Sequence, residues 1–200
     1  MRKVGVIGLG HVGSTVAYTL VTKGIADELV LIDTNEAKCT AEFYDLLDSL
    51  GRLDTYTKLS MNDYKALQDA DVVITAFVDI KALADGVNRF LEYSFNCQQA
   101  KQVGTALKEA GFHGVLINIS NPCDVITGLL QHYTGLSRQQ VFGTGTFLDT
   151  ARMQRAVSMS LDQNPHNIAG YVLGEHGESQ FAAWSTITVQ GEPITEIAKD

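Results

Sequence analysis

The chain has 200 residues, of which 45% are hydrophobic and 19% are charged, and its 23 acidic and 15 basic residues give a formal net charge of −8. This length and composition are those of an ordinary globular protein with one or two domains. The acidic balance, without any run of basic residues, argues against a large nucleic-acid-binding surface. No stretch approaches the roughly 18 consecutive apolar residues that a transmembrane helix needs.

Cysteine usage and the N-terminal residues both favour a cytoplasmic location. Cys39, Cys97 and Cys123 are widely spaced and include no Cys-x-x-Cys pair, so they do not form a disulfide framework. Cys123 is interpreted as a small buried apolar residue rather than a reactive thiol. Residues 1–3 precede a glycine-rich strand pattern and not the long apolar run of a signal peptide. We expect a cytoplasmic protein that binds neither membranes nor nucleic acids.

Strand and helix patterns alternate through the first three quarters of the chain. Short apolar patterns predict strands at residues 3–7, 28–32, 57–60, 71–77, 115–120 and 141–143. Helical periodicity follows at residues 12–22, 37–47, 88–111, 122–133 and 147–161. Asn35 is placed to cap the second of these helices, and Gly24 to end the first. Such alternation indicates an α/β fold of the Rossmann type, a doubly wound parallel sheet.

The pattern changes near Gly145. Short strand patterns occur at residues 168–174, 184–190 and 193–195, and Gly191-Glu192 between two of them indicates a hairpin. We therefore divide the chain into residues 1–145, the doubly wound domain, and residues 146–200, the start of an α+β domain. The second part is too short to close a hydrophobic core alone, so we expect this domain to be incomplete.

A glycine-rich turn follows the first predicted strand. Gly8, Gly10 and Gly13 have the spacing Gly-x-Gly-x-x-Gly. The first glycine permits a sharp turn, the second lets the backbone approach a pyrophosphate, and the third lets the helix pack tightly on the sheet. The helix that begins at Val12 offers N–H groups and the positive end of its dipole to the phosphates. Only the backbone of His11 is needed there, and its side chain is interpreted as exposed.

Asp33 ends the second predicted strand, twenty residues after Gly13. A carboxylate at this position accepts hydrogen bonds from ribose hydroxyls and repels a 2′-phosphate. Because no arginine follows in Thr34-Asn35-Glu36, the sequence favours NAD over NADP as the cofactor.

A second motif surrounds His176, in Gly174-Glu175-His176-Gly177, twenty-seven residues after Asp149. Histidine titrates near neutrality and can exchange the hydroxyl proton of a hydroxy acid while a hydride leaves its C2 carbon. A carboxylate beside the imidazole orients it and stabilises its charged form. Arg152, three residues after Asp149, can bind a substrate carboxylate through two parallel hydrogen bonds. Combined with the glycine turn, this motif points to hydride transfer between NAD and a small hydroxy acid.

Residues 8–33, 119–122, 145–152 and 174–177 resemble the L-lactate/malate dehydrogenase family. The closest likeness is to the L-2-hydroxyisocaproate dehydrogenases, and it is greatest over residues 111–184. The resemblance covers the whole chain, but members of the family continue well past Asp200. It implies that residues 1–145 form the NAD-binding domain and that residues 146–200 form the N-terminal part of the catalytic, substrate-binding domain.

The resemblance also implies roles for individual residues. His176 is the general acid/base, Asp149 orients it, and Arg152 holds the substrate carboxylate. Arg89 polarises the C2 carbonyl, Asn121 binds the substrate oxygen near the nicotinamide, and the Asn121-Pro122 bond is cis. The implied cofactor contacts are Gly8, Gly10, His11, Val12, Gly13, Asp33, Ile119 and Asn121. No metal site is expected, since neither a His-x-x-His motif nor a carboxylate cluster lies beside Cys123. Family likeness also suggests a homo-oligomer, either a dimer or a tetramer.

The substrate prediction rests on the composition of the loop before Arg89. Malate dehydrogenases have an additional arginine there, whereas residues 78–88 contain only Lys81 as a further basic residue and include Ile80 and Leu83. We therefore expect an NAD-dependent L-2-hydroxy-acid dehydrogenase that reduces bulky aliphatic 2-oxo acids such as 2-oxo-4-methylpentanoate. Two alternatives stay open: an L-lactate dehydrogenase, and an NAD-binding fragment without turnover.

Overall fold

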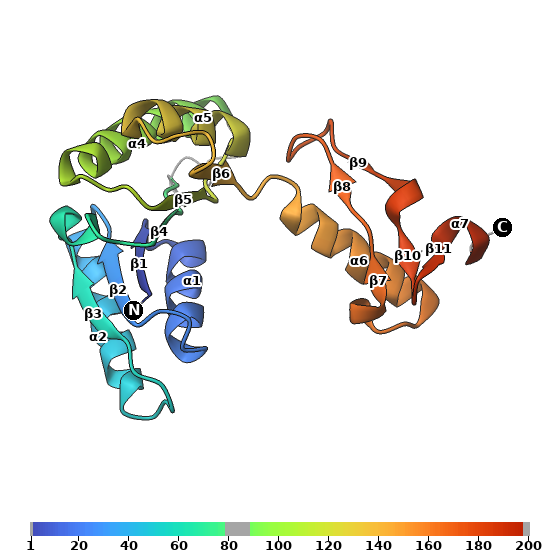
Figure 1. Cartoon of the computed structure of the whole chain (residues 1–200), viewed down its shortest axis with the longest axis horizontal. Helices are drawn as coiled ribbons and strands as arrows, with labels where there is room; N and C mark the ends of the chain where they lie inside the picture. The colour runs from blue at the N-terminus through green and yellow to red at the C-terminus, as the bar shows by residue number, and fades with distance from the viewer. Residues whose placement is uncertain (1, 79–88, 198–200) are drawn as a thin grey trace. The chain divides into compact units, whose positions relative to one another are not determined.

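The structure is a computed structural model that describes residues 2–78 and 89–197, with the backbone alone for residues 89–92. The chain divides into two compact units, Met1–Gly143 and Thr144–Asp200 (Figure 1).

The first unit is built on a six-stranded parallel sheet in the order β3-β2-β1-β4-β5-β6. Its strands are β1 (Lys3–Ile7), β2 (Glu28–Ile32), β3 (Lys58–Met61), β4 (Val72–Thr75), β5 (Val115–Asn118) and β6 (Val141–Gly143). The strand order reverses between β1 and β4, and ligands of doubly wound sheets bind at the carboxyl ends of the strands beside this reversal. The predicted Rossmann-type α/β fold is confirmed.

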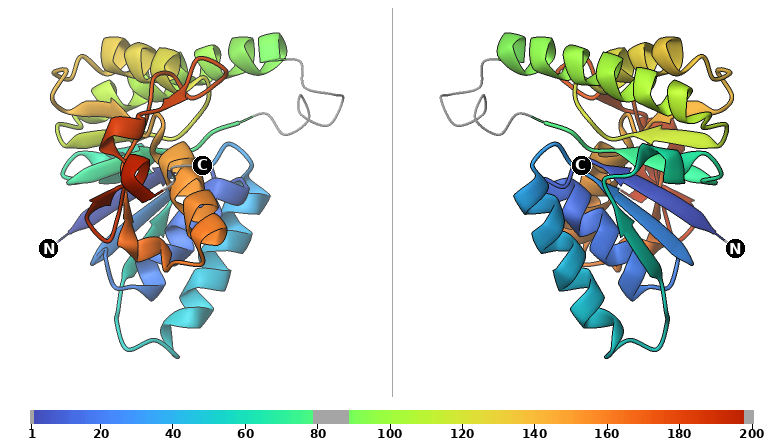
Figure 2. Two further views of the ribbon diagram at one scale, coloured as in Figure 1. Left: turned by 90° about the vertical axis from the view of Figure 1, so that its right-hand side faces the viewer. Right: turned by 90° about the vertical axis from the view of Figure 1, so that its left-hand side faces the viewer.

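Helices cover both faces of the sheet, as Figure 2 shows. They are α1 (His11–Thr22), α2 (Glu36–Leu50), α4 (Arg89–Ala110), α5 (Cys123–Thr134) and the short 3₁₀ helix η1 (Tyr64–Leu67). Leu29 and Leu31 pack with α1 and α2, whereas Val30 and Ile32 pack with η1, α4 and α5. Successive side chains of a strand point to opposite faces, so a strand buried on both faces is apolar throughout. This explains why the strands appear in the sequence as continuous apolar runs.

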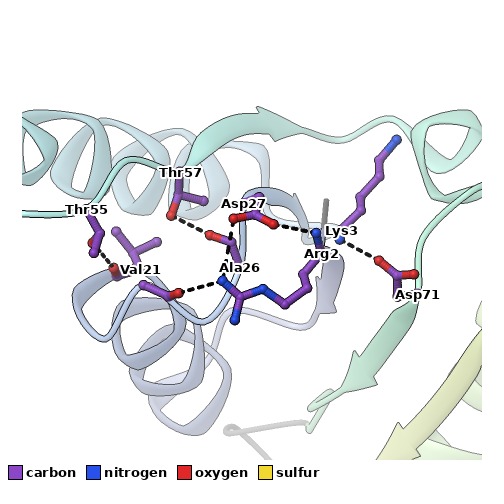
Figure 3. A network of polar contacts seen from close by, with 9 residues as sticks. Arg2, Lys3, Val21, Ala26, Asp27, Thr55, Thr57 and Asp71 are labelled. Carbon is purple, nitrogen blue, oxygen red and sulfur yellow. Dashed lines mark hydrogen bonds and ion pairs between the residues drawn. The ribbon is translucent and has the colours of Figure 1, made fainter.

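Polar contacts join the loops at the amino ends of the strands, opposite the carboxyl ends where ligands of such sheets bind (Figure 3). The backbone N–H of Lys3 donates to Asp71 at 2.7 Å. The hydroxyl of Thr57, which is fully buried, donates to the carbonyl of Ala26 at 2.8 Å. These contacts hold the loops between strands at the amino edge of the sheet.

The second unit begins with α6 (Phe147–Leu161), followed by the 3₁₀ helix η2 (Pro165–Asn167) and a series of short elements. These are β7 (Ile168–Ala169), β8 (Val172–Leu173), β9 (Phe181–Ala182), the 3₁₀ helix η3 (Trp184–Thr186), β10 (Thr188–Val189), β11 (Glu192–Pro193) and α7 (Ile194–Ile197). Strands β11, β10 and β7 form one antiparallel sheet, and β8 pairs with β9 in another. No described helix of either unit is long and apolar enough to span a membrane.

Several predicted boundaries in the second unit are wrong. The predicted strand at residues 168–174 is broken at Gly170, whose φ of +128° directs β7 and β8 into different sheets. The predicted strands at residues 184–190 and 193–195 contain η3 and the start of α7. The hairpin turn is Gln190-Gly191, with φ values of 53° and 89°, one residue earlier than predicted. Both residues have the positive φ that a two-residue hairpin turn of type I′ requires.

The strands of the first unit are also shorter than their apolar patterns. Pairing ends at Thr75 in β4 and at Asn118 in β5, where the neighbouring strands end too. The apolar patterns predict strand at residues 76–77 and 119–120, but these residues lie in loops at the carboxyl edge of the sheet.

Candidate active site

The turn after β1 requires glycine at two of its three positions. Gly8 has a φ of +94°, and a Cβ atom on it would lie 2.7 Å from backbone atoms of Ala76 and Phe77. A Cβ on Gly13 would lie only 1.8 Å from the carbonyl oxygen of Gly8. The turn is therefore packed backbone against backbone, which leaves the first turn of α1 close to the strand ends.

The N-terminus of α1 is placed to bind an anion. Gly10 is the N-cap, no side chain caps the helix, and its first turn contains no acidic residue. His11 and Val12, the first two helical residues, are exposed. Uncapped N–H groups at a helix N-terminus are the donors that phosphate oxygens accept from in dinucleotide-binding turns.

Asp33 lies immediately after β2 and contacts this turn. Its Oδ2 accepts a hydrogen bond from the backbone N–H of Leu9 at 2.6 Å, and its Oδ1 accepts one from Asn35 at 2.8 Å. The side chain of Asn62 accepts from the backbone N–H of Asp33 at 3.1 Å. Each carboxylate oxygen has a second lone pair, so both can still accept hydrogen bonds from ribose hydroxyls. A dinucleotide with a free ribose diol fits this geometry.

A cavity of about 290 Å³ lies beside the turn and Asp33 at the carboxyl edge of the sheet. Its lining includes Gly8, Gly10, Asp33, Tyr64, Phe77 and Phe95. Burial, and then the negative charge of Asp33, raise the pKa of Tyr64 to about 12. The phenol therefore stays neutral at physiological pH and can offer both an apolar ring and a hydrogen-bond donor to a ligand in the cavity.

Ile119 and Asn121 lie in the loop after β5, at the same edge of the sheet. The backbone N–H of Ile119 donates to the carbonyl of Thr75 at 2.9 Å. The bond between Asn121 and Pro122 is cis, which confirms that prediction. Asn121 itself is exposed, so its side chain is accessible to a ligand.

In the second unit, Asp149 contacts both His176 and Arg152. His176 Nδ1 donates a hydrogen bond to Asp149 Oδ2. Arg152 Nη1 lies 3.1 Å from Asp149 Oδ1, one helical turn further along α6. The Asp149 side chain is 7% exposed and the Arg152 side chain is 55% exposed. Because Nδ1 donates to the carboxylate, Nε2 of the neutral imidazole can accept a proton, and only the imidazolium can give that proton from Nε2.

Thr146, the N-cap residue of α6, and Thr150, in its first turn, place the histidine loop beside Asp149. The hydroxyl of Thr146 donates to the carbonyl of Val172 at 2.6 Å, and the backbone N–H of Val172 donates to the hydroxyl of Thr150 at 3.0 Å. These bonds attach β8 to the first turn of α6. The loop that follows β8 carries His176, so the attachment brings the imidazole to Asp149.

The environment of Asp149 shifts the pKa of its carboxyl group. Burial acts most strongly and raises the pKa, but the hydrogen bonds and charges of His176 and Arg152 together outweigh burial and lower it. The pKa of Asp149 is therefore lower in the folded state than in the unfolded state, and the ionised carboxylate stabilises the folded protein at pH values above the unfolded-state pKa. This stabilisation is lost as the pH falls through the folded-state pKa.

We therefore expect the difference in unfolding free energy between wild type and Asp149→Asn to narrow over the range from neutral pH down to below about 3.9, the pKa of an ordinary aspartate. Urea denaturation followed by tryptophan fluorescence measures it, because Trp184 is the only tryptophan of the chain and lies in the second unit. An equal difference at both ends of this pH range would show that the contacts of Asp149 do not depend on its charge.

The predicted site residues fall into two groups, each within one unit. The phosphate turn and Asp33 lie at the carboxyl edge of the sheet, as do Ile119 and Asn121, whereas Asp149, Arg152 and His176 cluster at the start of α6. Arg89 is the first residue of α4, and its side chain lies outside the described residues, as does the whole 79–88 segment with Ile80, Lys81 and Leu83. The described residues contain no group of three or more His, Cys, Asp or Glu side chains arranged to bind a metal ion.

Sequence reasoning missed several residues of the carboxyl edge. Asn62 and Tyr64 come from the segment between β3 and β4, which has no motif that links it to Asp33. Asn118 is buried within an apolar strand, and a lone polar residue in such a run is the signal that could have identified it.

The glycine turn, the carboxylate after β2 and the sheet reversal define a Rossmann-type dinucleotide-binding protein. Residues 2–143 match the family model for the lactate/malate dehydrogenase NAD binding domain, and residues 146–200 match that for the lactate/malate dehydrogenase alpha/beta C-terminal domain. The chain belongs to the lactate/malate dehydrogenase family. NAD is accordingly the cofactor of its first domain.

Curated relatives include L-lactate dehydrogenase 1 of Bifidobacterium longum, 40% identical over 199 residues, which cover 100% of the chain and 62% of the relative. L-lactate dehydrogenase 2 of Enterococcus faecalis is 40% identical over 197 residues, or 98% of the chain and 61% of the relative. The ligands-bound crystal structure of minor L-lactate dehydrogenase from Enterococcus mundtii is 38% identical, with a TM-score of 0.92 over 100% of this chain and 63% of that one. The chain thus spans about three fifths of the length of these proteins. Their names do not support the expected closeness to L-2-hydroxyisocaproate dehydrogenases.

We expect Asp33→Ser to weaken NADH binding by about 1.5–3 kcal/mol, or roughly 10- to 150-fold, because charge-assisted hydrogen bonds are lost. NADPH binding is expected to strengthen, since the repulsion of the 2′-phosphate is removed. Titration of NADH and NADPH by fluorescence measures both, and Asp48→Ser, which removes an exposed charge of α2, is the control. Equal losses for both cofactors would mean that Asp33 acts only by holding Leu9 in the turn.

Proposed function

We propose that the protein containing this chain is an NAD-dependent L-2-hydroxy-acid dehydrogenase, with pyruvate and L-lactate as its favoured substrate pair. The observation that carries this proposal is the contact of Asp149 with both His176 and Arg152 in a chain whose first unit is an NAD-binding domain. The three side chains supply a proton donor, its orienting carboxylate and a cation for an acid substrate.

In the direction of reduction, the guanidinium of Arg152 binds the substrate carboxylate. It has five N–H donors, and only Nη1 contacts Asp149, so the others remain for the substrate. Bound NADH supplies the hydride that adds to the C2 carbon. His176, protonated at the start, gives the proton on Nε2 to the C2 oxygen as the carbonyl becomes a hydroxyl. Asp149 keeps the Nδ1 proton in place and stabilises the imidazolium before transfer.

We further propose the predicted roles of Asn121, which binds the C2 oxygen, and of Arg89, which polarises the carbonyl. Ile119 and the residues of the glycine turn are proposed as cofactor contacts. Residues 146–200 are proposed as the N-terminal part of the catalytic domain. Cytoplasmic location and homo-oligomeric assembly stay predictions from composition and family likeness.

Two observations favour different substrates. The relatives are named L-lactate dehydrogenases, which supports pyruvate over the bulky aliphatic 2-oxo acids expected from the sequence. The bulky preference depends on Ile80, Leu83 and their neighbours, which lie outside the described residues, so it stays the second candidate.

The test is NADH oxidation followed at 340 nm, with pyruvate, 2-oxo-4-methylpentanoate, phenylpyruvate and oxaloacetate as substrates. We expect the highest kcat/KM for pyruvate. A higher value for 2-oxo-4-methylpentanoate would favour the second candidate, and a higher value for oxaloacetate would overturn both. NADH binding by fluorescence without turnover on any substrate would identify the chain as a cofactor-binding fragment.

A further inference from the structure

Two buried asparagines contact the loop between β5 and α5, which carries Asn121. Asn118 is the last residue of β5, and Asn96 lies on α4, which packs beside α5 over the sheet (Figure 1). Both side chains are fully buried. Buried polar side chains cost free energy unless their hydrogen bonds compensate, so the bonds that each makes indicate why it is there.

The side chain of Asn118 forms hydrogen bonds with both ends of this loop. Its Oδ1 accepts from the backbone N–H of Ser120 at 3.0 Å and from the hydroxyl of Thr75 in β4 at 3.0 Å. The two N–H groups of its Nδ2 are shared among three acceptors, the carbonyls of Ser120 and Cys123 and the hydroxyl of Thr127, each 3.1 Å away. One side chain thus connects a strand, the loop and the first turn of α5. Both ends of the segment that contains Asn121 are held by it.

Asn96 contacts the segment from the other side. Its Nδ2 donates to the backbone carbonyl of Asn121 at 2.6 Å. Its Oδ1 is buried and has no hydrogen-bond partner in the described part of the chain. An unpaired buried acceptor costs its desolvation free energy, which the single bond made by Nδ2 has to offset. The side chain of Asn96 therefore acts through its hydrogen bond to the backbone of Asn121.

We propose that Asn96 and Asn118 are positioning residues that fix the backbone at Asn121 and thereby aim its side chain at the substrate oxygen. This inference rests on the proposed function, in which Asn121 binds that oxygen. Helix α4 begins at Arg89, seven residues before Asn96, or about two helical turns. The same helix then carries one proposed substrate residue and holds the backbone of another.

The experiment uses Asn118→Val and Asn96→Leu, which remove the hydrogen bonds and keep a side chain in each place. The matched control is Thr57→Val, which removes a buried hydrogen bond at the opposite edge of the same sheet. The first readout, which does not require turnover, is hydrogen exchange of the backbone amides of residues 119–126 other than Pro122, relative to those of β1. The second readout is kcat and KM for pyruvate.

We expect both asparagine variants to speed exchange at residues 119–126 by about tenfold or more relative to β1. We also expect kcat/KM to fall by about 10- to 100-fold, since misplacement of a substrate-binding group by about 1 Å has effects of this size. Thr57→Val should change neither the relative exchange at residues 119–126 nor kcat/KM, although it lowers the free energy of unfolding.

Unchanged relative exchange in a folded Asn96→Leu protein would overturn the proposal, whatever the activity. Faster exchange with unchanged kcat/KM would also overturn it, because the position of the loop would then not matter for the reaction. If the wild-type chain bound NADH but turned over none of the substrates, it would act as a cofactor-binding fragment, and the exchange result alone would decide whether the two asparagines hold the loop.

Discussion

Replacing His176 with asparagine is expected to lower kcat for 2-oxo acid reduction by about 10²- to 10⁴-fold, the range that general acid–base catalysis contributes. The asparagine amide can still donate a hydrogen bond to Asp149, so the carboxylate is not left without a partner. It cannot carry the proton that the C2 oxygen needs. Steady-state NADH oxidation measures the loss, and fluorescence titration should show unchanged NADH affinity.

His166→Asn is the matched control, because His166 is exposed in the same unit. We expect its kcat to equal that of the wild type. A double variant, His176→Asn with Asp149→Asn, should lose no more activity than His176→Asn alone, since groups that act as one unit are not additive. Two independent, multiplying losses would contradict the assignment of Asp149 as the partner of the histidine.

Replacing Gly13 with alanine is expected to destabilise the first unit by about 3 kcal/mol or more, at or beyond the usual upper limit for overpacking a core. The added Cβ would lie 1.8 Å from the carbonyl oxygen of Gly8 and 3.3 Å from the Cβ of Ala76. The first neighbour is backbone, so the clash cannot be relieved by a change of rotamer. Only separation of α1 from the turn after β1 would relieve it, and NADH affinity should be lost with that separation.

Gly128→Ala provides the comparison within a helix of the same unit. Gly128 lies inside α5, and a Cβ there would meet no atom within 4 Å. Alanine should therefore stabilise the unit by roughly 0.5–1 kcal/mol through higher helix propensity. Urea denaturation followed by far-UV circular dichroism measures both variants. A Gly13→Ala protein with wild-type stability and NADH affinity would show that the turn is not packed as closely as the structure has it.

Much of the first unit could be predicted because its signals are local. A glycine turn, an apolar run and a helical period each lie within a few residues, and their alternation has few topological solutions. Asn35 was identified as a cap from its position alone, and it accepts the backbone hydrogen bond of Lys38. The second unit was harder, because strands of two residues have no period to detect and Gly170 separates two sheets within one apolar run.

The sequence alone determined the Rossmann-type fold, the family and the NAD cofactor, and it supplied the candidate residues for the proposed proton transfer. These depend on spacing along the chain, as between Gly8 and Asp33. The tertiary structure decided which distant groups meet: Asn62 with Asp33, Thr146 with Val172, and Asn96 with Asn121. Such hydrogen bonds join residues that only packing brings together. No local pattern specifies them, because each donor meets its acceptor only after the sheet and its helices have assembled.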